Sequence, residues 1–264
     1  MNYISNQFNI QQIPSYTLLI NAGFVKDLLA VVDQQNELRV FMEYAAEKPE
    51  PEAMKILSLP FKRVKVVIPH ESFSFIPTEL FEEEKLPVYA SYLSDENPSH
   101  VYFQQIDALG VTVVYQFDLL LLNRWKSIFP NCQIIPEFRM VLEQVQSKIP
   151  IHGHILGVHY SNQLVDIYLF VNGQIQVYNS FEISAIDDLS YYILNIYNQF
   201  NIEGKVDKII VSGLTISEAH AERLSQYGQQ LERVELSTNI QVPIDAEGLD
   251  LTQFHITFDA LSCE

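Results

Sequence analysis

Cysteine, glycine and long apolar runs are all scarce in this chain of 264 residues. The two cysteines, Cys132 and Cys263, lie far apart in the sequence. A chain of this length folds without disulfides, so we expect two free thiols in a reducing compartment. The apolar run Leu119 to Leu122 is far shorter than the ~20 residues that a membrane-spanning helix needs. The N-terminal stretch MNYISNQFNIQQIPSY lacks the basic and apolar regions of a signal peptide. These absences predict a soluble, cytoplasmic protein.

Basic residues are also few. Sixteen Lys and Arg stand against thirty-three Asp and Glu, which gives a formal net charge of −17. Such a charge repels phosphate backbones, so we expect no nucleic-acid partner, and it opposes attachment to an anionic membrane. Aromatic residues, in contrast, are plentiful, with 14 Tyr and 16 Phe. Because exposed aromatic side chains are typical of interfaces, we expect a protein or peptide partner, and the oligomeric state is left open.

The shortage of glycine bears on chemistry. Only 9 of the 264 residues are glycine, against a usual ~7%, and loops that bind phosphate depend on this residue. The sequence has no P-loop, no G-x-G-x-x-G and no G-x-S-x-G. The segment PHESFSF, Pro69–Phe75, is interpreted as the cap of a helix near Pro77. His152, His154 and His159 have no Cys or carboxylate beside them, so they are interpreted as solvated or core histidines and no metal site is predicted.

Two stretches half the chain apart share one pattern of short strands. Residues 164–171 are rich in β-branched and aromatic side chains, and residues 174–181 alternate polar and apolar. Between them lies Asn172-Gly173, the pair typical of a type I′ hairpin turn. Residues 18–44 have the same pattern. Alignment of Asn21 with His159 defines the offset between the two copies. The aligned apolar pairs are Ile20 with Val158, Val31 with Leu169, Val32 with Phe170 and, one position out of step, Val40 with Val177.

The elements that follow each meander also correspond, in the order helix, strand, helix, strand. The second half predicts a helix at 185–200, a strand at 208–213, a helix at 217–227 and a strand at 231–237. The first half predicts a helix at 51–58, a strand at 63–69, a short helix near 77–84, a helix at 119–129, a strand at 132–138 and a helix at 139–148. An extra strand pair at about 98–118 interrupts the first half. A repeat this long indicates two domains, 1–150 and 151–264, with the boundary in Ser147–His154.

A duplicated unit of antiparallel meander, helix, strand, helix and strand resembles the actin-like ATPase fold. The resemblance extends over nearly the whole chain and implies an α/β fold class of RNase H-like type, with two βββαβαβ domains and a small inserted hairpin in the first. The size and the insertion are similar to the pilus-assembly (PilM-like) and cell-division (FtsA-like) branch. The chain is most similar to a bacterial family of proteins of unknown function that carry a divergent actin-like fold.

This resemblance implies where a nucleotide would bind. In working members, the first turn of each meander carries an Asp-x-Gly loop whose N–H groups bind phosphates and whose Asp holds Mg²⁺ through water. A glycine-rich motif in the second domain receives the adenosine. The resemblance places Asn21 and His159 at the two acidic positions, Gly23 and Ser161 at the glycine positions, and Gly213 at the adenosine motif.

Both acidic positions have therefore lost their carboxylates. We expect these five residues to line a vestigial nucleotide cleft faced by both turns, with no catalytic residue, no metal and no cofactor. The chain would then be an inactive scaffold or protein-binding module, and likeness to the PilM-like branch implies a partner peptide in a groove of the first domain. The alternative is a divergent ATPase or kinase-like phosphotransferase that uses ATP with Mg²⁺ and takes its carboxylate from Glu71 or Asp166.

Overall fold

The computed structural model describes residues 2–161, 164–246 and 248–263. Contacts divide the chain into two compact units. The first contains residues 1–140, 237–249 and 256–264, and the second contains residues 141–236 and 250–255. The sequence-based boundary near residue 150 had assigned everything after it to the second domain, whereas two C-terminal segments pack with the first unit.

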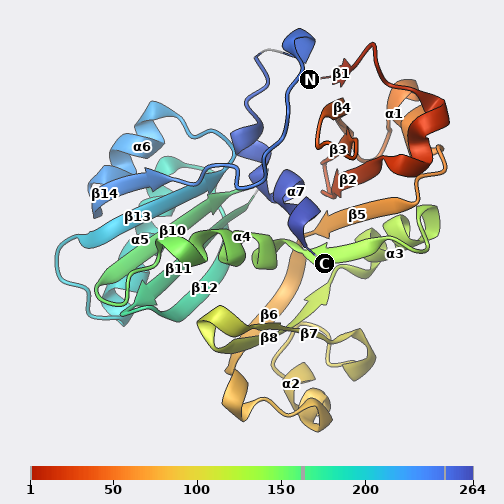
Figure 1. Ribbon diagram of the computed structural model, residues 1–264. Helices are drawn as coiled ribbons and strands as arrows, with labels where there is room; N and C mark the ends of the chain where they lie inside the picture. The colour runs from red at the N-terminus through yellow and green to blue at the C-terminus, as the bar shows by residue number, and fades with distance from the viewer. Residues whose placement is uncertain (1, 162–163, 247, 264) are drawn as a thin grey trace. The chain divides into compact units, whose positions relative to one another are not determined.

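A six-stranded sheet forms the centre of the first unit, with strand order β1-β4-β3-β2-β5-β9 (Figure 1). Strands β2, β3 and β4 form an antiparallel meander, and β5 and β9 continue from β2 in parallel. The short strand β1, which the sequence pattern did not indicate, pairs with the outer edge of β4. The bounds are β1 (Asn2–Ile4), β2 (Thr17–Asn21), β3 (Lys26–Val32), β4 (Leu38–Ala45), β5 (Arg63–Ile68) and β9 (Gln133–Pro136).

A five-stranded sheet forms the centre of the second unit, in the order β12-β11-β10-β13-β14. The order and the strand directions are those of β4-β3-β2-β5-β9. The bounds are β10 (His154–Tyr160), β11 (Leu164–Val171), β12 (Gln174–Glu182), β13 (Val206–Gly213) and β14 (Gly228–Arg233). The repeat that the sequence predicted is therefore a repeat of sheet topology.

The two meanders agree in register as well. In the first unit Ile20 is opposite Leu29, and in the second Val158 is opposite Ile167, so both partners are displaced by the offset that relates Asn21 to His159. Each meander also has one irregularity in its second pairing, between Val31 and Val32 and between Leu169 and Phe170, again at equivalent positions. A slip of one residue would turn every apolar side chain to the opposite face, so the apolar pattern fixes this register.

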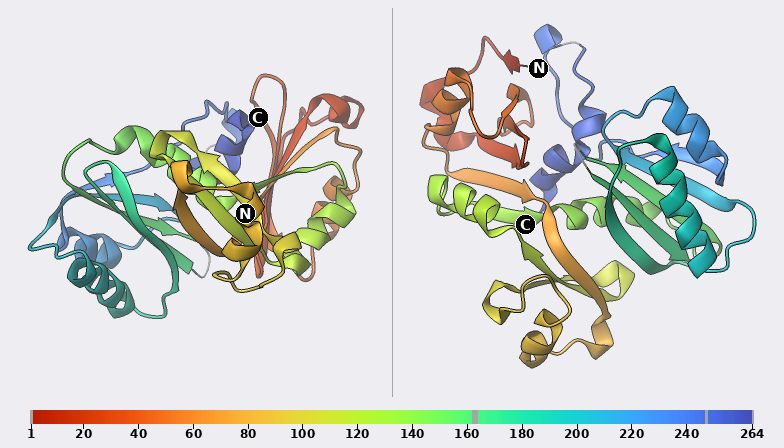
Figure 2. Two further views of the ribbon diagram at one scale, coloured as in Figure 1. Left: turned by 90° about the horizontal axis from the view of Figure 1, so that it is seen from below. Right: turned by 180° about the vertical axis from the view of Figure 1, so that it is seen from behind.

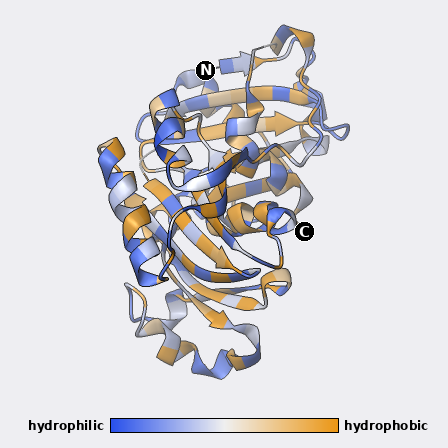
Figure 3. Cartoon of the chain, turned by 90° about the vertical axis from the view of Figure 1, so that its left-hand side faces the viewer, coloured by the Kyte–Doolittle hydropathy of each residue, from blue (hydrophilic) through white to orange (hydrophobic). Residues whose placement is uncertain are grey.

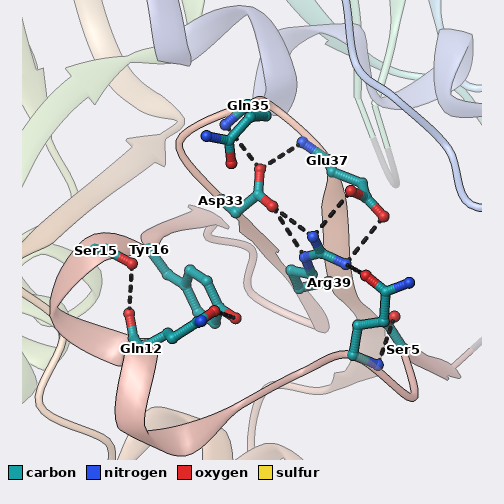
Figure 4. Close-up of polar contacts among 9 residues, drawn as sticks. Ser5, Gln12, Ser15, Tyr16, Asp33, Gln35, Glu37 and Arg39 are labelled. Carbon is teal, nitrogen blue, oxygen red and sulfur yellow. Dashed lines mark hydrogen bonds and ion pairs between the residues drawn. The ribbon is translucent and has the colours of Figure 1, made fainter.

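The turns of the meanders have the expected backbone conformation. Asn172 and Gly173 both have positive φ, 51° and 79°, as a type I′ turn requires. In the first unit a polar network centred on Arg39 fixes the turn between β3 and β4 (Figure 4). The Asp33 carboxylate accepts hydrogen bonds from the Gln35 and Glu37 N–H groups and from Arg39 Nη2 at 2.6 Å. Arg39 Nη1 also donates to Gln7 Oε1 at 2.9 Å, which ties the N-terminal segment to the turn.

The helices cover the sheets with apolar faces. In the second unit Leu189, Ile193 and Ile196 of α5 pack with Leu156 and Val158 in one buried cluster. Figure 2 shows α5 along the sheet, and Figure 3 shows apolar colours along the strands. Burial of each such side chain contributes about 1.5–3 kcal/mol. The α-helices are α1 (Pro51–Leu57), α2 (Leu86–Ala90), α3 (Leu119–Ile128), α4 (Glu137–Val145), α5 (Ile186–Gln199), α6 (Glu218–Ser225) and α7 (His255–Asp259). The 3-10 helices are η1 (Ile10–Ser15), η2 (Thr78–Leu80), η3 (Glu83–Lys85), η4 (Pro98–His100), η5 (Asp107–Leu109), η6 (Gln146–Lys148), η7 (Ile244–Ala246), η8 (Leu251–Phe254) and η9 (Ala260–Ser262).

Residues 70–117 form an appendage on the first unit, built on a three-stranded sheet β6-β8-β7 (Figures 1 and 2). The predicted pair is present as β7 (Tyr102–Ile106) and β8 (Val111–Phe117), but β6 (His70–Pro77) is a third strand. The interpretation of PHESFSF as a helix cap was therefore wrong. Phe73 and Phe75 are two residues apart, the period of a strand, and each pairs with β8.

The C-terminal segment completes the core of the first unit. Phe258 stacks on Phe41 at a centroid distance of 6.4 Å. Lys65 Nζ donates to the carbonyl oxygens of Ala260 at 3.0 Å and Leu261 at 3.1 Å, at the end of η9. These contacts explain why segments that are distant in sequence belong to one unit.

Candidate functional site

The first turn, after β2, is closed by a side chain of its own hairpin. The Gly23 N–H donates to Asp27 Oδ1 at 2.9 Å. Arg124 Nη2 donates to the same oxygen at 2.7 Å and to the Gly23 carbonyl at 3.4 Å. A Cβ at position 23 would lie 2.2 Å from the Lys26 carbonyl oxygen, so only glycine fits this turn. Asn21 is the last residue of β2 and pairs with Leu28 and Val67.

The Asp27 carboxylate is buried, with 3% of its surface exposed. Burial raises the pKa of Asp27, while the Gly23 N–H and the Arg124 guanidinium favour its charged form. The Arg124 guanidinium also lies 5.0 Å from the centre of the Trp125 ring. Asp27 and Arg124 were not singled out from the sequence. An Asp four residues after a glycine in a tight hairpin was the available signal for Asp27, whereas Arg124 is distant in sequence.

The second turn, after β10, uses its own donors in a similar way. The Ser161 N–H and hydroxyl both donate to the Leu164 carbonyl, each at 3.0 Å. His159 is buried, and its Nδ1 lies 2.8 Å from Ser212 Oγ on the neighbouring strand β13. The imidazole therefore lies within the sheet interior, where the resemblance would place an acidic side chain.

The third position, at the end of β13, lies beside His255, a residue that was not singled out from the sequence. Gly213 has a φ of 81°, and its N–H donates to His255 Nε2 at 3.2 Å. That ring nitrogen must be unprotonated to accept the hydrogen bond. Burial lowers the pKa of His255 well below its usual value, and His159 and Arg233 lower it further, which is consistent with a neutral ring. His159 and His255 are in edge-to-face contact at 5.7 Å.

The structure thus brings together His159, Ser212, Gly213 and His255 within the second unit, and Asn21, Gly23, Asp27 and Arg124 within the first. That Asn21 and His159 face one cleft stays a prediction.

The two carboxylates of the alternative hypothesis are placed differently. Asp166 is buried opposite His159 on β11, and it accepts hydrogen bonds from the Tyr178 and Ser180 hydroxyls, each at 2.6 Å. Glu71 is exposed on β6 of the appendage. Asp166 therefore has structural partners inside the sheet, and Glu71 belongs to a different sheet.

A polar cleft of about 350 Å³ also lies within the first unit, between Thr17, Asp33, Arg63 and Leu261. Its two cations are engaged by backbone oxygens, Arg63 with the Ser15 carbonyl and Lys65 with the end of η9. The Asp33 carboxylate is held by Arg39. Among the described residues that line it, the cleft therefore presents neither a free cation nor a free carboxylate to a charged ligand.

The residues at the three nucleotide positions do not fit ATP with Mg²⁺. Neither Asn21 nor His159 can neutralise a metal ion, and the N–H groups of Gly23, Ser161 and Gly213 are bonded to acceptors of the chain itself. Across residues 2–161, 164–246 and 248–263, no group of three or more His, Cys, Asp or Glu side chains could hold a metal ion. Neither Cys132 nor Cys263 forms a disulfide.

Comparison with solved structures defines the class. A Bacteroides thetaiotaomicron protein, described as having an actin-like ATPase fold and unknown function, is 19% identical and superposes with a TM-score of 0.69, covering 98% of this chain and 100% of its own. The PilM-PilN type IV pilus biogenesis complex gives 11% identity and a TM-score of 0.56 over 93% of this chain and 98% of the other. The duplicated sheets described above are thus those of the actin-like ATPase fold.

The chain belongs to the family described as Protein of unknown function (DUF3822), which matches residues 5–231. Among curated proteins, no relative matches the sequence. In the described part of the chain, no helix is long and apolar enough to cross a membrane.

Proposed function

We propose that this protein is an actin-fold protein without nucleotide chemistry, which acts in the cytoplasm as a protein-binding module. One observation supports this above all others. At each of the three positions where a nucleotide would contact the backbone, the N–H group donates to an acceptor of the chain itself, namely Asp27, the Leu164 carbonyl or His255.

The energetics of the first turn favour this proposal. A phosphate at the Gly23 N–H would have to displace the Asp27 carboxylate, which also holds Arg124. A buried group left without its partner costs about 1–3 kcal/mol, and more if it is charged. A phosphate placed beside a buried carboxylate would in addition meet a like charge at short range. Binding would therefore require the turn to be rebuilt.

Two observations support a protein as the partner. The acidic chain is unsuited to nucleic acid, and it carries large exposed apolar side chains such as Phe24, Leu80 and Tyr92. PilM, whose fold is similar, is described in a complex with PilN. The likeness at this identity extends to the fold alone, so the use of that fold for protein binding belongs to the proposal.

Thermal unfolding with and without Mg-ATP tests the proposal. A ligand at a hundred times its dissociation constant stabilises the folded state by about 2.7 kcal/mol, which is a measurable shift in melting temperature. We expect no shift with millimolar Mg-ATP and no release of phosphate above background. The Asn21→Asp variant, which restores the first acidic position, should behave like the parent. A Mg-dependent shift in either protein would contradict the proposal.

A further inference from the structure

The appendage, residues 70–117, holds a disproportionate share of the negative charge. It contains eight carboxylates and a single lysine, so it contributes −7 to the formal net charge of −17. The eight acidic residues are Glu71, Glu79, Glu82, Glu83, Glu84, Asp95, Glu96 and Asp107. The lysine, Lys85, is paired with Glu82 at 2.6 Å.

An apolar surface lies among these carboxylates. Phe81 contacts Phe103 at a ring-centroid distance of 5.0 Å and stacks on Tyr89 at 5.6 Å, so three rings form a continuous row. Phe103 is 41% exposed, and Tyr92 is 75% exposed. We define the aromatic surface as Leu80, Phe81, Val88, Tyr89, Tyr92 and Phe103.

This surface lies partly over the core of the appendage, because Phe81 and Tyr89 pack against that core, whereas Val88, Tyr92 and Phe103 are exposed. Ala90, Leu93, Val101 and Val114 form a buried cluster of their own. The exposed side chains of Val88, Tyr92 and Phe103 are thus not required to bury that cluster. Exposed apolar side chains beside a polar rim are a common feature of interaction sites.

Glutamates at the edge of the aromatic surface, which we call the rim, give it a negative charge. Glu82, Glu83 and Glu84 follow Phe81 directly. Glu83 and Glu84 are exposed, and Glu82 pairs with Lys85. Potentials at an interface are complementary, so a partner that covers the rings must bring positive charge to this rim. A second copy of the chain would bring the same carboxylates to the same place, which argues against self-association here.

We propose that the aromatic surface of the appendage binds a peptide segment of a partner protein, in which Lys or Arg residues flank two or three apolar side chains. The apolar side chains would pack on the row formed by Phe103, Phe81 and Tyr89, and the basic ones would pair with the glutamates after Phe81. This inference rests on the proposed function as a protein-binding module and specifies its site and the class of its partner.

Selection from a random 12-residue peptide display library on the full-length chain tests the specificity. Enriched peptides should combine net positive charge with aromatic or aliphatic residues. Synthetic copies should bind in solution by fluorescence anisotropy, and their affinity should fall as salt is raised. Enrichment of acidic or neutral peptides, or no enrichment at all, would overturn the inference.

Matched variants locate the site. Tyr92→Ser with Phe103→Ser removes two rings, and Glu83→Lys with Glu84→Lys reverses two rim charges. Each pair should weaken the selected peptide by about tenfold or more, as loss of interface anchors does. The controls are Leu120→Ser, at an exposed apolar position on α3, and Glu47→Lys with Glu203→Lys, which changes the net charge equally at exposed sites elsewhere. Equal weakening by variants and controls would mean general attraction to an acidic protein and would refute the site.

These experiments distinguish a failure of the inference about the appendage from a failure of the proposed function. If peptides fail to bind this surface while Mg-ATP still gives no thermal shift, the inference about the appendage falls and the non-nucleotide proposal stands. If Mg-ATP binds, the proposed function fails first, whatever the peptides do. Circular dichroism on each variant verifies that the fold is retained.

Discussion

At the scale of the residue, the Asp27 carboxylate closes the first turn from within. It satisfies the Gly23 N–H and the Arg124 guanidinium together. Position 21, where the resemblance would place an acidic residue, is Asn, and the carboxylate that closes this turn belongs to Asp27. His255 has a comparable place at Gly213, where an unprotonated ring nitrogen accepts the N–H.

The Asp27 network should make a measurable contribution to stability. Asp27→Ala leaves one partly buried N–H and one guanidinium without their acceptor, so we expect a loss of about 2–3 kcal/mol in the free energy of unfolding. Asp27→Asn, which keeps an oxygen for Gly23, should cost less. Urea unfolding of both variants, made in the parent and in an Arg124→Met background, measures the coupling energy between Asp27 and Arg124. A coupling energy near zero would show that the ion pair contributes nothing.

Glu232 offers a test by pH. Its hydrogen bonds from Lys148 and Lys208, at 2.5 and 2.7 Å, lower the pKa of this carboxyl below its ordinary value near 4.5. A lowered pKa in the folded state adds stability above the pKa of the unfolded chain, and that stability disappears as the pH falls through the folded pKa. The parent should therefore exceed Glu232→Gln in unfolding free energy at pH 6.5, and the difference should shrink below about pH 4.5. A difference that is constant with pH would contradict the ion-pair explanation.

At the scale of the element, the two meanders are so alike that their irregularities coincide. An irregular pairing at Val31/Val32 has its counterpart at Leu169/Phe170, at the same offset that relates Asn21 to His159. Bulges bend a strand and increase its twist, and they are kept as features of a fold. The appendage is the main departure from this symmetry, because it interrupts one copy between β5 and α3.

The appendage should be removable. His70 and Phe117 are partners across β6 and β8, so the two ends of the segment are adjacent and a short Gly-Ser linker can replace residues 70–117. We expect a folded chain that is less stable by about 1.5–3 kcal/mol, because Phe138 loses its ring contacts with Phe73 and Tyr115. Far-ultraviolet circular dichroism and cooperative urea unfolding would check this. Loss of cooperative unfolding would mean that the six-stranded sheet depends on the appendage.

At the scale of the whole molecule, the acidic charge and the closed turns both lead us to expect no response to Mg-ATP. In a working member of the superfamily, metal and phosphate bridge the two turns, and binding changes the shape. Here the donors are already bonded within each unit. We therefore expect no change in the radius of gyration on addition of Mg-ATP, measured by small-angle scattering at matched ionic strength. Compaction together with micromolar binding in calorimetry would contradict this.

Much of the architecture could be predicted from local sequence patterns. The offset between the two copies, the type I′ turn at Asn172-Gly173 and the helix–strand order after each meander are confirmed. The errors arose where a pattern was short. β6 was interpreted as a helix cap because its partner β8 is some forty residues away, and a strand is recognised most surely by its partner.

The duplicated sheet topology can be predicted from the sequence alone, because alternation of apolar residues and turn chemistry are local properties of each stretch of chain. The absence of carboxylates at positions 21 and 159 is likewise a property of the sequence. The groups that bond to the turns instead follow from tertiary packing. Arg124 meets Asp27 across 97 positions and His255 meets Gly213 across 42, and such pairings depend on how the elements pack rather than on neighbouring residues. Packing also places the C-terminal segment in the first unit, because Phe258 contacts β4 and η9 contacts Lys65 of β5.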